Sequence, residues 1–184
     1  SSRRMGGSNK LLQPVDGVPM LRRAVNAALA SRCASVRVVT GADADAVEAC
    51  LAGLEVAFTH NPDHASGMAS SLRCGLAALP ADADAAVVLL ADMPWIDRSH
   101  VDRLLAAFDP RQPKIVAPVR DGRRGNPVLW PREFFAEMMA VSGDVGAREV
   151  LQRHAARIAT VACDDDAIFA DVDTPAELAA ENTR

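Results

Sequence analysis

The stretch Ala85-Ala86-Val87-Val88-Leu89-Leu90-Ala91-Asp92-Met93-Pro94 indicates the fold class more clearly than any other part of the chain. Its apolar residues are continuous rather than alternating, which is typical of a strand that is buried on both faces. Helices cover both faces of such sheets, and ligands bind at the carboxyl ends of the strands. Asp92 directly follows the predicted strand, so we expect its carboxylate at a functional site.

The segments on either side repeat an alternation of strand and helix. A helix is predicted to begin near Pro19, and further helices are predicted at 43–51, 66–79, 99–108, 131–141, 145–156 and from Pro175. Strands are predicted at 36–40, 56–59, 85–91, 115–119, 127–130 and 158–162, with 115–119 and 127–130 forming a pair. Ser99 is the expected N-cap of the helix at 99–108. The pattern predicts a Rossmann-like, three-layer α/β/α fold with a mostly parallel central sheet.

Composition limits the classes of function. The chain has 184 residues, of which 49% are hydrophobic, and this suits one domain spanning 1–184. The net charge is -4 and no basic run is interleaved with aromatic residues, so a nucleic-acid partner is not expected. No apolar run approaches the roughly 18 residues of a membrane span, and we expect a cytoplasmic protein. The four cysteines lie far apart in the sequence and are interpreted as free thiols.

The first residues carry a candidate phosphate-binding segment, Ser2-Arg3-Arg4-Met5-Gly6-Gly7-Ser8-Asn9-Lys10. Glycines between two fixed cations, Arg4 and Lys10, allow the backbone to wrap a polyphosphate. The alternative is a pair of solvated cations near a chain terminus. The segment is not a P-loop, because Leu11 stands where a metal-binding Ser or Thr would follow the lysine. No strand precedes it, so we expect a first strand upstream of Ser1.

Two aspartates are candidate ligands of a divalent metal. Asp92 follows the buried strand, and Asp173 ends a short predicted strand just before Pro175. Magnesium that bridges triphosphate oxygens uses only one or two protein carboxylates, so these two would suffice. For Asp173 the alternative is a helix N-cap role.

Small polar residues at a strand-to-helix junction are candidates for contact with a nucleotide base. Asn61 follows a predicted strand, and Gly67 and Ser71 stand at the start of the next helix, where amide and hydroxyl groups could contact the edge of a base. The alternative is an ordinary loop and helix cap. No dinucleotide fingerprint, Ser-His-Asp arrangement or Cys-His arrangement stands out, so covalent catalysis is not supported.

Taken together, these segments resemble the MobA-like nucleotidyltransferase family, and within it most closely the molybdenum cofactor cytidylyltransferases. Ser2, Arg4, Met5, Gly6 and Lys10 occupy positions of the family's opening motif, whose preceding Leu-Ala-Ala-Gly would lie upstream. The resemblance continues in the family's order through Gly67-Met68, Ser71-Leu72, Gly75-Leu76, 90–94, 124–127, 143–148 and 171–175.

The resemblance implies a magnesium- or manganese-dependent transfer of CMP from CTP to the phosphate of molybdopterin, with release of pyrophosphate. By this resemblance Arg4 and Lys10 hold the triphosphate, Asp92 and Asp173 hold the metal, and the catalytic set is Lys10, Arg4 and Asp92. The nucleotide-binding residues are Ser2, Arg4, Gly6, Lys10, Asn61, Gly67, Ser71 and Asp92. Guanylyl transfer, transfer to another small phosphorylated metabolite, and a non-catalytic nucleotide-binding or cofactor-delivery role are the alternatives.

The second half of the chain would then face the acceptor. The nucleotide-binding half is expected at about 1–110 and the acceptor-binding half at about 111–184. Arg124, Asn126 and Arg148 are the candidates for contact with the pterin phosphate, although both arginines suit a solvated surface equally well. A molybdoenzyme or its chaperone is the protein partner that the resemblance implies.

Overall fold

The computed structural model describes residues 9–141 and 147–172. Its α-helices are α1 (Met20–Ala30), α2 (Ala44–Cys50), α3 (Met68–Ala77), α4 (Arg98–Ala107), α5 (Phe135–Ala140) and α6 (Arg148–Arg153). Its strands are β1 (Pro14–Val15), β2 (Val18–Pro19), β3 (Arg37–Thr40), β4 (Ala57–His60), β5 (Ala85–Val88), β6 (Ile115–Arg120), β7 (Arg123–Arg124), β8 (Val128–Pro131) and β9 (Ile158–Ala162). Short 3-10 turns are η2 (Lys10–Leu12), η3 (His64–Ser66), η4 (Arg132–Phe134), η5 (Ala155–Arg157) and η6 (Ala167–Phe169).

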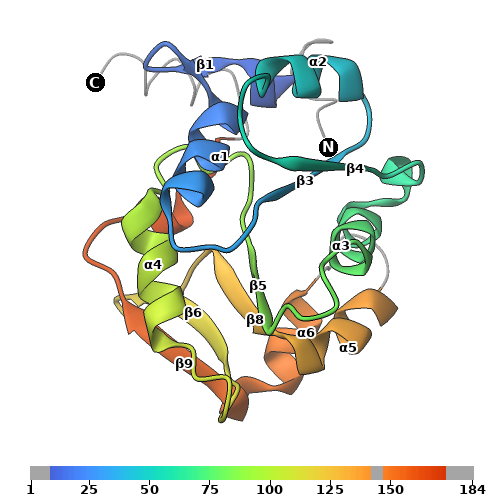
Figure 1. The fold of residues 1–184 in the computed structure, drawn as a ribbon. Helices are drawn as coiled ribbons and strands as arrows, with labels where there is room; N and C mark the ends of the chain where they lie inside the picture. The colour runs from blue at the N-terminus through green and yellow to red at the C-terminus, as the bar shows by residue number, and fades with distance from the viewer. Residues whose placement is uncertain (1–8, 142–146, 173–184) are drawn as a thin grey trace.

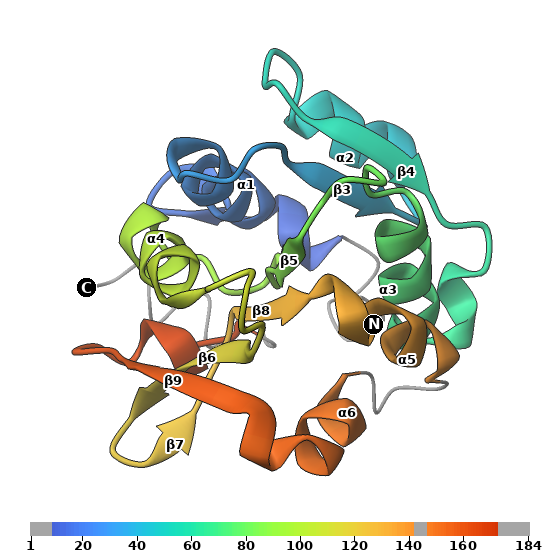
Figure 2. The same cartoon turned by 60° about the horizontal axis from the view of Figure 1, so that its bottom comes forward.

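A mixed sheet forms the centre of the molecule (Figures 1 and 2). Strand β8 lies between β5 and β6 and runs antiparallel to both, whereas β9 runs parallel to β6. Strands β3 and β4 form a separate parallel pair. The predicted pairing of 115–119 with 127–130 is confirmed by the register Val116↔Leu129. Strands β5, β6 and β9 run in one direction, whereas β8 and the short β7 run in the opposite direction because the β6–β7 hairpin reverses the chain.

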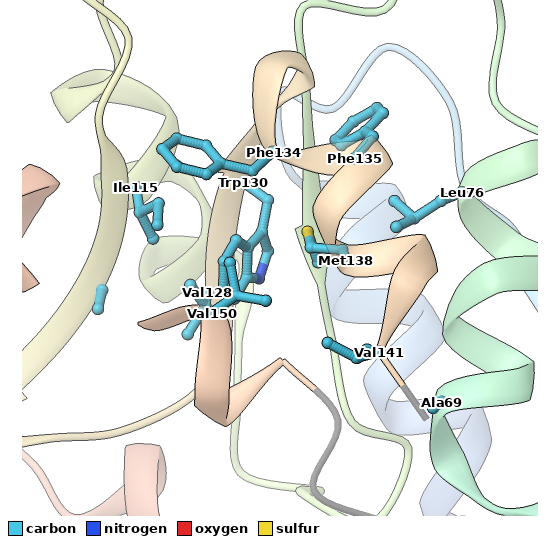
Figure 3. Packing of buried hydrophobic residues seen from close by; sticks show 11 residues of the cluster. Ala69, Leu76, Ile115, Val128, Trp130, Phe134, Phe135, Met138, Val141 and Val150 are labelled. Carbon is cyan, nitrogen blue, oxygen red and sulfur yellow. The ribbon is translucent and has the colours of Figure 1, made fainter. Parts of the chain in front are cut away.

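Alternating side chains pack on the two faces of this sheet. Ile115 and Trp130 point into a cluster with α3 and α5, which Figure 3 shows around Phe134, Phe135 and Met138. Val116 and Leu129, each one residue away, pack against Leu104 of α4 on the opposite face. Because strand side chains alternate between faces, this pattern means that helices cover both sides. The predicted three-layer α/β/α class is therefore confirmed.

The strand predicted at 85–91 is shorter in the structure, but helices pack on both of its faces as predicted. Strand β5 ends at Val88 rather than at Ala91, and all four of its residues are partly buried. Ala86 and Val88 pack toward the α3–α5 side, whereas Ala85 and Val87 pack toward α4. The continuous apolar run thus reflects contact on both faces of the sheet.

Two local features differ from the sequence predictions. The N-cap of α4 is Asp97 rather than Ser99: the Asp97 carboxylate accepts from the amides of Ser99 and His100, and the His100 ring completes a capping box. Before α1, strands β1 and β2 form a hairpin around Asp16 and Gly17, whose φ angles are 50° and 77°. Such positive φ values are typical of a two-residue hairpin turn, and Asp-Gly is a common sequence for it.

The described residues also bear on membrane insertion and on the state of the cysteines. None of the described helices is long and apolar enough to cross a membrane. The four cysteines are free thiols as predicted; Cys163 is buried, and Cys33, Cys50 and Cys74 are partly buried. The helix expected from Pro175 lies outside the described residues.

Candidate functional site

Lys10 is a buried lysine whose ammonium group joins two distant segments of the chain. Its Nζ donates to Asp92 Oδ2 at 2.9 Å and to the carbonyl oxygen of Val172 at 3.2 Å. The residue is only 8% exposed. Because a buried ammonium is costly unless it is paired and hydrogen-bonded, these oxygens stabilise the lysine in this position.

The residues beside Lys10 fix the turn that carries it. The Asn9 side chain caps η2 by accepting from the Leu11 amide at 3.1 Å, and its Nδ2 donates to the Asp43 carboxylate at 3.4 Å. Leu11 packs against the apolar cluster of α1 and β3 that includes Leu21. The turn is therefore anchored by a polar cap on one side and by hydrophobic contact on the other.

Asp92 lies beyond the carboxyl end of β5, where a site in an open α/β sheet is expected. Its side chain is 26% exposed, so it contacts both Lys10 and solvent. Its backbone carbonyl accepts from the Val172 amide at 2.9 Å. Its Oδ2 atom is the acceptor for the Lys10 ammonium.

Several predicted site residues lie outside the described residues, namely Ser2, Arg4, Gly6 and Asp173. Val172 immediately precedes Asp173 in the sequence, and its backbone binds Asp92 through N–H and Lys10 through C=O. The structure thus brings together Lys10, Asp92 and the segment that leads to Asp173.

Asn61, Gly67 and Ser71, the residues predicted to contact the base, lie in a second group. Asn61 is 3% exposed, and its Nδ2 donates to Ser70 Oγ at 2.9 Å and to Ser71 Oγ at 3.1 Å. Its Oδ1 accepts from the Asp63 amide at 3.0 Å, and its backbone amide donates to Thr40 at the end of β3. These bonds place the start of α3 against the ends of β3 and β4.

Gly67 is the residue that allows α3 to begin there. Its φ is 108° and its ψ is 177°, a conformation that only glycine adopts readily. It accepts from the backbone amide and the hydroxyl of Ser70. The glycine lets the chain reverse from η3 into α3, and it keeps Ser70 and Ser71 within reach of Asn61.

The three candidate acceptor residues are spread over two elements. Arg124 is exposed on β7, and Arg148 is exposed at the first position of α6. Within the described part of the chain neither arginine forms an ion pair. Asn126 is half-buried, and its backbone amide donates to the Ile168 carbonyl at 2.9 Å. This bond ties the loop after β7 to η6, only four residues before Val172.

Comparisons with known proteins decide the family. A model of the MobA-like NTP transferase domain matches residues 1–176. The chain belongs to the MobA-like NTP transferase family. A protein named nicotine blue oxidoreductase, from Paenarthrobacter nicotinovorans, is 32% identical over 97% of this chain and 90% of its own length. A molybdenum cofactor guanylyltransferase from Cupriavidus metallidurans is 30% identical over 95% of this chain and 86% of its own length.

Solved structures share the fold of this MobA-like domain. A nucleotidyl transferase from Methanothermobacter superposes with a TM-score of 0.85 at 19% identity, over 99% of this chain and 91% of that protein. A Mycobacterium tuberculosis protein in complex with manganese superposes with a TM-score of 0.79 at 22% identity, over 97% of this chain and 94% of that one. At these identities the likeness establishes the fold, and the chain is a nucleotidyltransferase by its family.

The donor atoms near Lys10 suit a hard divalent cation in this MobA-like domain. Asp92 supplies a carboxylate and Val172 supplies a backbone carbonyl, and both kinds of oxygen are ligands that magnesium and manganese accept. Among the described residues, no group of three or more His, Cys, Asp or Glu side chains could hold a metal.

Sequence reasoning missed three contributors to these groups. The Val172 carbonyl is a backbone acceptor and carries no residue-type signal. Asn9 caps the Lys10 turn, and the pattern of an Asn just before a short helical turn could have identified it. Ser70 shares Asn61 with Ser71, but two adjacent serines cannot be told apart without the helix register.

Proposed function

We propose that this MobA-like nucleotidyltransferase transfers CMP from CTP to the terminal phosphate of molybdopterin and releases pyrophosphate. The observation that carries the proposal is the position of the Lys10 ammonium between the Asp92 carboxylate and the Val172 carbonyl. It places a fixed cation beside a candidate metal ligand, at the strand end where a triphosphate would bind.

The chemistry requires mainly positioning and charge neutralisation. An oxygen of the acceptor phosphate forms a bond to the α-phosphorus, while the bond from the α-phosphorus to the bridging oxygen breaks and pyrophosphate leaves with that electron pair. The acceptor oxygen is already anionic, so no strong general base is needed. Lys10 and Arg4 would hold the triphosphate and offset the charge that develops on the leaving group.

Asp92 and Asp173 are proposed to hold Mg²⁺ or Mn²⁺. When bound, the metal would neutralise phosphate charge as a Lewis acid. Ser2, Gly6, Asn61, Gly67 and Ser71 are proposed to form the remainder of the nucleotide site. Arg124, Asn126 and Arg148 are proposed to face the acceptor, in an arrangement with the nucleotide half at about 1–110 and the acceptor half at about 111–184 of one domain.

Guanylyl transfer is the second candidate. CTP is favoured by Ser2 and by Asn9-Lys10, which look more like the cytidylyl branch of the family. GTP is favoured by the similarity to the Cupriavidus guanylyltransferase. Isothermal titration of the protein with CTP and with GTP in magnesium separates the two candidates, because tighter binding of GTP would refute the cytidylyl assignment.

The relative named as an oxidoreductase introduces a different class of reaction. The present sequence contains no Gly-x-Gly-x-x-Gly fingerprint for a dinucleotide, which favours transfer over hydride chemistry. Release of pyrophosphate from CTP or GTP in the presence of molybdopterin supports the proposal. Oxidation of a reduced nicotinamide cofactor by the protein, without pyrophosphate release, would refute it. Binding of nucleotide with neither reaction would indicate a delivery protein.

We place the reaction in the cytoplasm and expect a molybdoenzyme, or the chaperone that serves one, to receive the product.

A further inference from the structure

Asn61 does not have the geometry of a residue that contacts the base directly. Its Oδ1 accepts from the Asp63 amide at 3.0 Å, and a backbone N–H can only donate, so this bond fixes the orientation of the side-chain amide. Both hydrogens of its Nδ2 are then directed at serine hydroxyls, Ser70 at 2.9 Å and Ser71 at 3.1 Å. With 3% exposure, Asn61 has no donor left for a ligand.

The two serines differ in where their own protons go. The Ser70 hydroxyl is within 2.8 Å of the Gly67 carbonyl and 3.0 Å of the Asp63 carbonyl, so its proton stays inside the protein. Ser71 is half-buried, and no carbonyl or carboxylate among the described residues accepts its proton. Because Asn61 already donates to its oxygen, the Ser71 hydroxyl is oriented to donate outward.

We propose that Asn61 is a positioning residue that makes Ser71 a hydrogen-bond donor to a carbonyl oxygen of the substrate base. The inference rests on the proposed nucleotide site. Cytosine carries a carbonyl at O2 and guanine carries one at O6, whereas adenine carries no carbonyl and has an amino group where guanine has O6. A donor fixed in this way favours a carbonyl-bearing base over adenine, whichever of CTP and GTP is the substrate.

A double-mutant cycle tests the coupling between the two side chains. Ser71→Ala removes the outward donor and leaves the bonds of Asn61 to Ser70 and Asp63 intact. We expect it to weaken binding of the preferred nucleotide about fivefold to tenfold, with little change for ATP. Asn61→Leu should cause a similar loss alone and little further loss when Ser71 is already alanine.

Ser66→Ala is the matched control. Ser66 ends η3, and its hydroxyl donates to the Asp63 carbonyl at 2.8 Å, whereas the side-chain hydrogen bonds of Asn61 among the described residues go to Ser70, Ser71 and Asp63. The Ser66→Ala variant should bind the preferred nucleotide and ATP with the same affinities as the wild type. Calorimetric dissociation constants for CTP, GTP and ATP in magnesium are the readout, and thermal unfolding checks each variant.

A second variant keeps the test decisive if Asn61→Leu does not fold. Asn61→Asp retains an acceptor for the Asp63 amide but removes the Nδ2 donor, so the Ser71 proton would turn inward to the new carboxylate. The added charge opposes every triphosphate equally, so the ratio of ATP affinity to CTP or GTP affinity isolates the orientation effect. We expect this ratio to approach that of Ser71→Ala.

The outcomes separate this inference from the proposed function. Independent, multiplicative losses in the double variant, or equal losses for ATP, would overturn the positioning role of Asn61 and leave the proposed function standing. A wild-type protein that binds ATP as tightly as CTP and GTP would also overturn it. Failure of the wild type to bind any of the three nucleotides would overturn both.

Discussion

Replacing Lys10 by methionine tests the energetic role of the buried ammonium. Lys10→Met keeps most of the side-chain volume but removes the ammonium, and with it the hydrogen bonds at 2.9 Å to Asp92 and 3.2 Å to Val172. Hydrogen bonds from a charged donor contribute about 1.5–3 kcal/mol each. Part of that gain offsets the cost of burying the ammonium, and the Asp92 side chain remains 26% exposed and solvated. We therefore expect a net loss of about 2 kcal/mol in the free energy of unfolding.

Thermal unfolding at neutral pH is the assay for this variant. For a chain of this size a loss of 2 kcal/mol lowers Tm by about 4–8 °C. Lys114→Met is the matched control, because Lys114 is the only other lysine of the chain and is exposed. Its effect should stay within about 0.5 kcal/mol.

A further variant identifies the cause of the loss. Adding Asp92→Asn to Lys10→Met should restore part of the stability, because no uncompensated carboxylate then remains beside the methionine. If Lys10→Met unfolded at the same temperature as Lys114→Met, the buried ion pair would contribute nothing and the reasoning would be refuted.

Two further predictions concern stability away from the ion pair. Although burial acts to raise it, hydrogen bonds from Ser99 and His100 lower the pKa of Asp97 to about 2 from 3.8. Because the pKa of Asp97 is lower in the folded state, its ionised carboxylate stabilises the fold above pH 3.8. This stabilisation is lost as the pH falls from about 4 to 2. Because Asp97 is largely exposed, Asp97→Ala should lower the free energy of unfolding by only about 1 kcal/mol at neutral pH. It should also reduce the dependence of that free energy on pH between about 4 and 2. An unchanged pH dependence would exclude the capping role. At Gly125 a Cβ would overlap the Ile168 carbonyl, so Gly125→Ala should lower the free energy of unfolding, measured in urea, by about 1–3 kcal/mol. Gly122→Ala is the control: its Cβ would meet no atom, and the variant is strained only through the φ of 74° at that position. Equal loss in the two variants would argue against close packing of the loop on η6.

Much of the fold followed from the sequence because hydrophobic periodicity has a direct structural cause. The strand at 158–162 was predicted with the bounds of β9, and the β5 pattern correctly indicated helices on both faces of the sheet. The direction of β8 was harder to predict. Parallel and antiparallel neighbours bury the same apolar side chains, so only the tight turn at Asp121 and Gly122 indicated the reversal.

The sequence signals a candidate site residue only where a side chain, rather than the backbone, carries the chemistry. Asp92 was chosen as a candidate from its place after a buried strand, and the structure brings Lys10 to it from 82 residues earlier in the sequence. The role of Val172 could not be predicted, because any residue type presents the same backbone carbonyl. Asp97 and Ser99 are both favourable cap residues two positions apart, so composition alone could not choose between them.

The fate of the α-phosphate of the nucleotide tests nucleotidyl transfer most directly. The protein would be incubated with molybdopterin, magnesium and CTP labelled either at the α-phosphate or at the γ-phosphate, beside an Asp92→Ala variant. We predict that the α-label appears in the acceptor product and the γ-label in pyrophosphate, and that Asp92→Ala slows both by about a hundredfold or more. Release of the γ-label as orthophosphate, or undiminished turnover by Asp92→Ala, would contradict the proposed function and the metal site at Asp92.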